Sequence, residues 1–169
     1  IVDTSDEWIT TRTGIQTRHH CTTETHTDMC VGAARQALEN AGISPEDIGA
    51  CVVATFSSDY LSPSAACMVQ RGLGLPHDAV CFDLNAACSG FLFAIHTMEC
   101  LMAQAPRKYG LVIGAEMLSR FINWEDRGTC VLFGDGAGAV VVEWREDYPS
   151  LCAVLGCRGN TDALLIPGV

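Results

Sequence analysis

Cys88 is the residue whose type and position best fit nucleophilic chemistry. It stands in the segment NAACSG (residues 85–90), between a short apolar run at 79–84 and a long apolar stretch with helical spacing that begins at Ser89. A thiol at such a strand-to-helix junction meets unpaired N–H groups and the positive end of the helix, which stabilise the reactive thiolate. Small neighbours permit a sharp turn and leave room for a substrate, as in the elbows that present nucleophiles for acyl transfer. A purely structural role stays open, because free cysteines are usually buried small residues.

Trp8 and Arg12 form a second candidate site near the beginning of the chain. They are four residues apart and lie on one side of a predicted helical turn, where an indole face and a guanidinium suit a purine and a phosphate. The alternative is that Trp8 only packs against the core, which is the usual role of an aromatic side chain.

A glycine-rich segment, GDGAG (134–138), follows DRGT (126–129) and the apolar run CVLF (130–133). A dinucleotide fingerprint requires GxGxxG after a strand and at the start of a helix, whereas these glycines alternate strictly and lead into the strand-like run AVVVEW (139–144). The segment therefore argues against a Rossmann loop and predicts a tight hairpin turn or a close backbone approach.

The composition excludes several classes of protein. The chain has 169 residues, 49% of them hydrophobic and 18% charged, which is typical of one packed domain. Its formal net charge of −10 opposes nucleic-acid binding. The ten cysteines are scattered singly without CxxC spacing, so we expect neither a disulfide scaffold nor a metal site. The longest apolar stretch (90–105) contains His96 and Glu99 and is shorter than the about 20 residues that cross a bilayer, so we expect no membrane span.

Alternating helix and strand patterns are expected to position the candidate residues. The predicted helices, with Thr27 and Ser62 as the N-caps of the first two, cover residues 27–42, 62–74 and 89–104. The predicted strands cover residues 50–56, 79–84, 109–116, 130–133, 139–144 and 151–157, the fourth and fifth forming a hairpin. This alternation implies one α/β domain with a mainly parallel sheet covered by helices on both faces.

Three segments in this order and spacing, TSDEWI with RTGI, DLNAACSGF, and DRGTCVLFGDGAGAVVV, resemble the beta-ketoacyl-acyl-carrier-protein synthase III family. The resemblance extends over essentially the whole sequence. It implies a thiolase-like α/β fold, in which residues 1–169 are the N-terminal half of a five-layer αβαβα architecture with a mainly parallel mixed sheet flanked by helices. The missing initiator Met and the abrupt ends are then expected, because the opening strand and the C-terminal half of that fold are absent.

The resemblance also implies an activity. The family initiates type II fatty acid synthesis by decarboxylative Claisen condensation of acyl-CoA, here expected to be acetyl-CoA, with malonyl-acyl carrier protein through a cysteine acyl-enzyme. It implies no metal and no cofactor, since acyl-CoA is a substrate, and it implies a homodimer in the cytoplasm. Three alternatives stay open: a starter-specific condensing enzyme of secondary metabolism, a hydroxymethylglutaryl-CoA synthase-like protein, and a noncatalytic dimerisation partner of the same fold.

Individual positions match the motifs of the family. The resemblance makes Cys88 the nucleophile, Trp8 and Arg127 the pair that sandwiches the adenine of CoA, and Arg12 a cation near its phosphates. Leu118 and Phe133 match residues that line the acyl pocket and its approach. The catalytic His and Asn of the family, and most of its basic surface for the carrier protein, belong to the missing half, so we expect the fragment alone to be inactive.

The histidines of this chain are expected to be ordinary residues: His19, His20, His26, His77 and His96. His96 lies two helical turns, or ~12 Å, beyond Cys88 on the same predicted helix. At that separation it is too far away to deprotonate the thiol directly.

Overall fold

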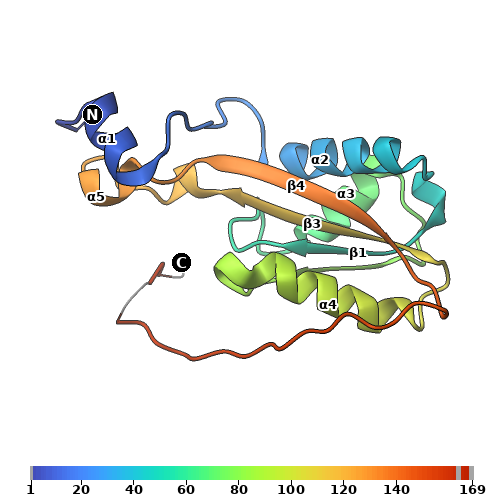
Figure 1. Cartoon of the computed structure of the whole chain (residues 1–169). Helices are drawn as coiled ribbons and strands as arrows, with labels where there is room; N and C mark the ends of the chain where they lie inside the picture. Colours follow the sequence, from blue (N-terminus) through green and yellow to red (C-terminus); the bar gives the residue numbers. More distant parts are fainter. Residues whose placement is uncertain (1, 163–164, 168–169) are drawn as a thin grey trace.

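A four-stranded mixed sheet with the order β2-β1-β3-β4 forms the centre of the computed structural model, which describes residues 2–162 and 165–167. β1 (Ile48–Ala54) pairs in parallel with β2 (Val80–Leu84) and with β3 (Tyr109–Met117), and β3 pairs antiparallel with β4 (Asp135–Glu143). The helices α2 (His26–Ala41) and α3 (Ala65–Leu73) cover one face, and α4 (Gly90–Met102) covers the other (Figure 1). This arrangement confirms the predicted mainly parallel sheet with helices on both faces.

Alternate residues of the central strand point to opposite faces and build two apolar cores. On β1, Cys51 and Val53 pack towards α2 and α3, whereas Ala50, Val52 and Ala54 pack towards α4. Every residue of β1 is buried, as expected for a parallel strand covered on both faces. The helices contribute side chains four residues apart, namely Cys30, Ala34 and Leu38 from α2 and Ala94, Met98 and Met102 from α4.

The observed starts of α2 and α3 differ from the predicted N-caps, because other side chains provide the caps. Thr25, not Thr27, caps α2 and forms a capping box with Asp28. Ser64, not Ser62, caps α3 by accepting a hydrogen bond from the N–H of Cys67. The first N–H groups of α3, those of Ala65 and Ala66, are further satisfied by the carboxylate of Asp83 on β2 at 2.7 and 2.8 Å.

The predicted strand at 130–133 is wrong, because a side-chain cap starts a helix just before it. The carboxylate of Asp126 accepts hydrogen bonds from the N–H of Gly128 and the hydroxyl of Thr129, and the short helix α5 (Arg127–Cys130) follows. A four-residue apolar run cannot by itself distinguish strand from helix.

The predicted hairpin turn at 134–138 is also wrong. Most of this segment lies inside β4, where Gly136 and Gly138 stand opposite Glu116 and Gly114 of β3. The run 139–144 is strand through Glu143, as predicted, but its partner is β3 rather than the residues just before it. The glycine-rich sequence therefore starts a long antiparallel strand instead of reversing the chain.

The predicted strand at 151–157 is wrong as well. These residues are exposed and belong to no helix or strand, and the segment runs back along α4 (Figure 1). One hydrogen bond attaches it there, because the N–H of Leu151 donates to Oε1 of Glu99 at 2.8 Å. Apolar residues alone do not make a strand without a neighbouring strand to supply hydrogen bonds.

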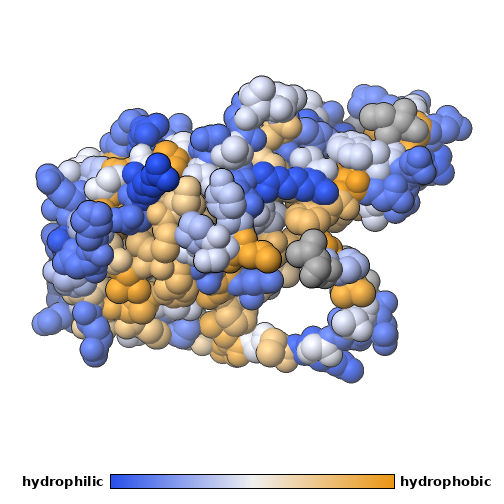
Figure 2. Space-filling model, turned by 180° about the vertical axis from the view of Figure 1, so that it is seen from behind, coloured by the Kyte–Doolittle hydropathy of each residue, from blue (hydrophilic) through white to orange (hydrophobic). Residues whose placement is uncertain are grey.

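Apolar side chains gather on the surface over α4 and the β2 edge of the sheet (Figure 2). Leu92 of α4 is 67% exposed and Val80 of β2 is 43% exposed. Since β1 is the only strand that pairs with β2 in the described part of the chain, this surface combines an open strand edge with exposed apolar groups. We call it the α4 face below.

Candidate functional site

Cys88 occupies a sharp turn between β2 and α4. It is the middle residue of a 3-10 turn, η2 (Ala87–Ser89), which leads directly into α4. Ala87 has φ +47°, a left-handed conformation that costs an L-residue about 1–2 kcal/mol. The side chain of Asn85 supports the turn by accepting a hydrogen bond from the N–H of Ala87 at 3.2 Å. Cys88 is exposed and two residues from the start of α4, so the predicted elbow geometry is confirmed, while its role as nucleophile stays a prediction.

Close packing holds the elbow against the sheet. Gly90 is the first residue of α4 and is buried, and a Cβ placed on it would lie 3.2 Å from the Cβ of Ala54 at the end of β1. The N–H of Thr55 donates to the carbonyl oxygen of Leu84 at 3.0 Å, which continues the β1–β2 pairing up to the elbow. A glycine at position 90 therefore lets α4 begin directly on the strand ends.

Several other cysteines are poor nucleophiles because they are buried or half-buried. Burial raises the pKa of the Cys30 thiol to about 12 and that of Cys81 to about 11, and it raises the pKa of Cys51 well above its usual value. Cys130 is buried too, although in α5 and not in the predicted strand. Thiolate chemistry at ordinary pH therefore has to use one of the more accessible cysteines.

Four cysteines besides Cys88 are exposed: Cys67, Cys100, Cys152 and Cys157. Cys67 also lies in the first turn of a helix, a position that the sequence analysis overlooked. Its thiol faces the carbonyl oxygen of Cys81 at 3.9 Å. Cys88 is the exposed cysteine that combines a helix start with a strained turn.

Trp8, Arg12 and Arg127 converge, as predicted, although Trp8 and Arg127 are far apart in sequence. Trp8 and Arg12 belong to α1 (Asp6–Thr13), and Arg127 opens α5. The guanidinium carbon atoms of Arg12 and Arg127 lie 4.4 and 4.5 Å from the ring centroid of Trp8. Arg127 also donates to the carbonyl oxygen of Asp3 at 3.1 Å, which ties α5 to the residues before α1. We call these three side chains the Trp8 clamp; its binding of CoA stays a prediction.

The Trp8 clamp is closed in this structure. A planar ring inserted between an indole and a guanidinium needs two stacking distances, or about 7 Å in total. The observed separation of 4.5 Å between the Arg127 guanidinium and the Trp8 ring has room for only one stacking distance. An adenine ring between them therefore requires the Arg127 side chain to move outwards.

Leu118 and Phe133, the predicted acyl-pocket residues, lie at the edge of the sheet where the parallel strands β1, β2 and β3 end. Met117 and Asp135 are the last pair of the β3–β4 ladder, and Leu118 and Phe133 lie just beyond it on the two chain segments. Leu118 is half-buried at the start of η3 (Leu118–Arg120), and Phe133 is 39% exposed. Figure 1 shows α1, α5 and the beginning of α4 at this end.

The structure also contains a buried polar network that the sequence analysis did not find. His26 is fully buried, and its Nε2 lies 2.9 Å from Oγ1 of Thr55 and 3.2 Å from the carbonyl oxygen of Ala115. The carboxylate of Glu116 accepts hydrogen bonds from the hydroxyls of Thr55 and Ser57. Burial raises the pKa of Glu116, although these hydrogen bonds act in the opposite direction. The network joins the ends of β1 and β3 to the start of α2.

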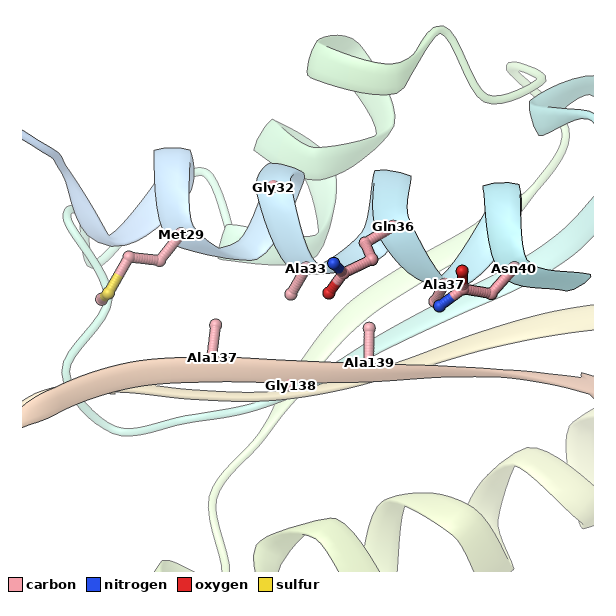
Figure 3. Close-up of a pocket in the computed structure, with 9 residues that line it drawn as sticks. All are labelled: Met29, Gly32, Ala33, Gln36, Ala37, Asn40, Ala137, Gly138 and Ala139. Atoms are coloured by element: carbon pink, nitrogen blue, oxygen red, sulfur yellow. The ribbon is translucent and has the colours of Figure 1, made fainter.

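A cavity lies between α2 and β4, apart from the predicted site residues (Figure 3). Its volume is about 490 Å³, and it is lined by Met29, Gly32, Ala33, Gln36, Ala37, Asn40, Ala137, Gly138 and Ala139. Figure 3 shows the side chains of Ala137 and Ala139 directed from β4 towards α2. The lining has no ionisable group, so this cavity offers no acid, base or nucleophile for catalysis.

Among residues 2–162 and 165–167, no set of three His, Cys, Asp or Glu side chains is arranged to hold a metal ion. No helix in the same residues combines the length and the apolar character needed to cross a membrane.

Known proteins resemble this chain in sequence. The family model described as 3-oxoacyl-[acyl-carrier-protein] synthase III matches residues 82–159. A beta-ketoacyl-[acyl-carrier-protein] synthase III of Clostridium acetobutylicum is 48% identical over 160 residues, which cover 95% of this chain and 49% of that protein. The corresponding synthase of Rhizorhabdus wittichii is 51% identical over 167 residues, covering 97% and 52%. The chain thus spans about half the length of these curated relatives.

The fold agrees with the sequence comparison. The crystal structure of 3-oxoacyl-[acyl-carrier-protein] synthase III from Aquifex aeolicus superposes with a TM-score of 0.82 and 51% sequence identity, covering 87% of this chain and 47% of that one. The predicted thiolase-like α/β fold is confirmed by this likeness. In sequence and in fold, this chain is thus similar to about half of a 3-oxoacyl-[acyl-carrier-protein] synthase III.

Proposed function

We propose that the complete protein is an acyltransferase that initiates type II fatty acid synthesis. It condenses acyl-CoA, with acetyl-CoA as the expected starter, with malonyl-acyl carrier protein, and it uses no cofactor. The observation that carries the proposal is the exposed Cys88 on a strained elbow at the start of α4, in a chain about half identical to synthases of this type. These relatives favour the proposal over the alternatives from secondary metabolism and hydroxymethylglutaryl-CoA synthesis.

In the first step, the Cys88 thiolate attacks the carbonyl carbon of the acyl-CoA thioester. The new C–S bond forms, the bond to the sulfur of CoA breaks, and CoA leaves as a thiol after taking up a proton. The backbone N–H of Cys88, at the start of α4, is the expected donor to the oxyanion of the tetrahedral intermediate. A thiolate suits this step because it is both a strong nucleophile and a good leaving group.

In the second step, the malonyl group loses CO₂ and its carbanion attacks the acyl carbon. The bond between that carbon and Cys88 breaks, and the thiolate is regenerated. The family resemblance places the His and Asn that act in this step in the C-terminal half of the fold, so we assign those groups to the rest of the protein. The same applies to the basic surface for the acidic carrier protein, because this chain carries a net charge of −10.

The Trp8 clamp is the proposed site for the nucleotide end of CoA. Trp8 and Arg127 offer an aromatic face and a stacked guanidinium to adenine, and Arg12 supplies a positive charge for the phosphates. Leu118 and Phe133 are the proposed acyl-pocket residues at the same end of the sheet. We further propose that the complete protein is a cytoplasmic homodimer.

Acylation of the complete protein tests the proposal. After a short incubation with acetyl-CoA, peptide mapping should find the acetyl group on Cys88. The Cys88→Ser variant should lose both the label and condensation, because a Ser hydroxyl has no matched base there. Cys100→Ser, which alters an exposed cysteine on α4, the helix that follows Cys88, is the control and should keep both. Label on another cysteine, or normal condensation by Cys88→Ser, would show that the assignment is wrong and favour a noncatalytic role.

A further inference from the structure

The stretch after α1 docks against the segment that joins α5 to β4. We call residues 14–21 the arm. The N–H of Asp135 donates to the carbonyl oxygen of His19 at 2.7 Å, and Nε of Arg18 donates to the carbonyl oxygen of Val131 at 2.5 Å. The two backbones touch, because a Cβ placed on Gly134 would lie 2.9 Å from the carbonyl oxygen of His19. A close backbone approach therefore explains the glycine at position 134, whereas a Cβ placed on Gly136 or Gly138 would meet nothing within 4 Å.

We call the contact between the arm and residues 131–135 the joint. The carboxylate of Asp135 holds the joint together. Its Oδ2 accepts hydrogen bonds from the N–H of Cys21 at 2.8 Å and from the hydroxyl of Ser119 at 2.7 Å. Its Oδ1 accepts from the N–H of Ser119 at 2.8 Å. Partial burial opposes ionisation, but these hydrogen bonds outweigh it and lower the pKa of Asp135. One ionised group thus connects the arm, the residues after β3 and the start of β4.

Along the chain, each side of the joint follows a few residues after one half of the Trp8 clamp. The arm follows directly after α1, which carries Trp8 and Arg12, and Asp135 follows α5, which begins with Arg127. A shift of the arm relative to β4 therefore moves the indole relative to the Arg127 guanidinium. A displacement of about 1 Å is enough to impair a stacking or positioning contact.

We propose that Asp135 is a positioning residue for the nucleotide end of acyl-CoA. By fixing the arm to the start of β4, its carboxylate sets the position of α1 relative to α5, and so the position of Trp8 when the Arg127 side chain moves outwards to admit the adenine ring. This inference rests on the proposed function, because it takes the Trp8 clamp to be the CoA site. It assigns to the GDGAG segment a part in substrate binding without any contact to the substrate.

The Asp135→Asn variant isolates this role. It keeps the size of the side chain but replaces one acceptor oxygen by an NH₂ group, which then faces an N–H donor of Cys21 or Ser119. Loss of a hydrogen bond to a charged group corresponds to a change of about tenfold or more in an equilibrium. We expect the concentration of acyl-CoA that half-saturates acylation to rise about tenfold, with the limiting rate changed less than about twofold.

The experiment compares two acyl donors on the complete protein. Acetyl-CoA carries the nucleotide, whereas acetyl-pantetheine carries the same thioester without it. The increase in mass of the intact protein measures the acylation of Cys88. Asp135→Asn should raise the half-saturating concentration of acetyl-CoA and leave that of acetyl-pantetheine unchanged. Asp28→Asn is the matched control, because that carboxylate likewise accepts an N–H and a hydroxyl hydrogen bond, at 2.9 and 2.7 Å, but at the start of α2. Asp28→Asn should change the half-saturating concentration of neither donor.

Each outcome separates this inference from the proposed function. Equal effects of Asp135→Asn on both donors, or no effect on acetyl-CoA, would overturn the positioning role. If Asp135→Asn does not fold, Gly134→Ala disturbs the same joint through the carbonyl of His19 and has to show the same selective loss; a Gly134→Ala protein with unchanged half-saturation would also overturn it. If the wild-type protein binds no CoA and is not acylated, both proposals are wrong.

Discussion

Strain and exposure occur at adjacent residues of the elbow. Ala87 is the non-glycine residue with positive φ in residues 2–162 and 165–167, and Cys88 beside it is exposed. A backbone held in a sparsely populated region persists only where the surroundings fix it, and such residues cluster at functional sites. Here the surroundings are the side chain of Asn85 and the packing of Gly90 on Ala54.

The first prediction concerns the backbone of the elbow. We expect Ala87→Val to destabilise the complete protein by about 2 kcal/mol, because a β-branched residue is especially unfavourable at positive φ. Ala87→Gly should stay within about 1 kcal/mol of wild type, because relief of strain offsets the greater freedom of glycine when unfolded. Urea unfolding measures both. Equal stability of the Val and Gly variants would contradict the strained conformation.

The second prediction concerns thiol reactivity at pH 8. With pKa values of about 12 and 11, Cys30 and Cys81 have thiolate fractions of roughly one in ten thousand and one in a thousand. Iodoacetamide should therefore label Cys88 in the native complete protein well before either of them. Peptide mapping over time gives the order of labelling, and unfolding in urea, which removes the burial, should make the rates similar. Early labelling of Cys30 in the folded protein would contradict its burial.

At the scale of elements, carboxylates fasten the loops at the strand ends to the helices. Asp59 accepts hydrogen bonds from the N–H groups of His26 and Thr27 at the start of α2, and from the guanidinium of Arg120 in η3 at 2.6 Å. Burial of Asp59 raises its pKa, but the hydrogen bonds from Thr27 and Arg120 prevail and lower it to about 2. One carboxylate thus joins the β1 end, α2 and η3.

The third prediction is an acid dependence that Asp59 causes. The folded pKa is about 2, below the value of about 3.9 in an unfolded chain, so the stabilisation is fully present above about pH 4 and is lost as the pH falls towards 2. The contribution is about 2 kcal/mol. The difference in urea stability between wild type and Asp59→Asn should therefore shrink between pH 4 and pH 2. Asp147→Asn, which removes an exposed pair with Arg145, is the control and should show no such change.

Local patterns predicted the central elements well. Apolar runs and helical spacing predicted β1, β2, β3 and the three long helices, because the hydrophobic periodicity of neighbouring residues reflects burial on one or both faces. The strand positions at 130–133 and 151–157 were wrong, because an apolar run becomes a strand only when another strand pairs with it. β4 pairs with β3 across a loop of more than a dozen residues, and no local signal specifies that partner.

The candidate site divides in the same way. The junction that presents Cys88 could be predicted from neighbouring residues, since a strand end, small residues and a helix start follow one another. The approach of Arg127 to Trp8 depends on contacts between distant segments, so only the family resemblance predicted it. The network of His26, Thr55 and Glu116 gave no signal, because its members are ordinary polar residues until the fold brings them together.

At the scale of the whole molecule, the chain has one well-covered face and one open face. α2 and α3 bury one side of the sheet, whereas α4 on the other side keeps apolar residues at the surface, next to the unpaired edge of β2 (Figure 2). Large exposed apolar patches on a protein mark interaction surfaces or sites of aggregation. Since the curated relatives are about twice as long as this chain, we expect further parts of the complete protein to cover the α4 face.

The last prediction is that residues 1–169, produced alone, self-associate through the α4 face. Leu92 is 67% exposed on α4, and burying a Leu side chain contributes about 1.5–3 kcal/mol. Leu92→Glu should therefore weaken the association by at least about tenfold, because it removes that contribution and places a charge in the contact. Leu61→Glu is the matched control, since Leu61 is 94% exposed in the loop before α3, and it should leave the association unchanged. Sedimentation velocity over a range of concentrations measures the effect. A wild-type chain that stays monomeric and melts in one sharp cooperative transition would show that the α4 face is stable when exposed to solvent.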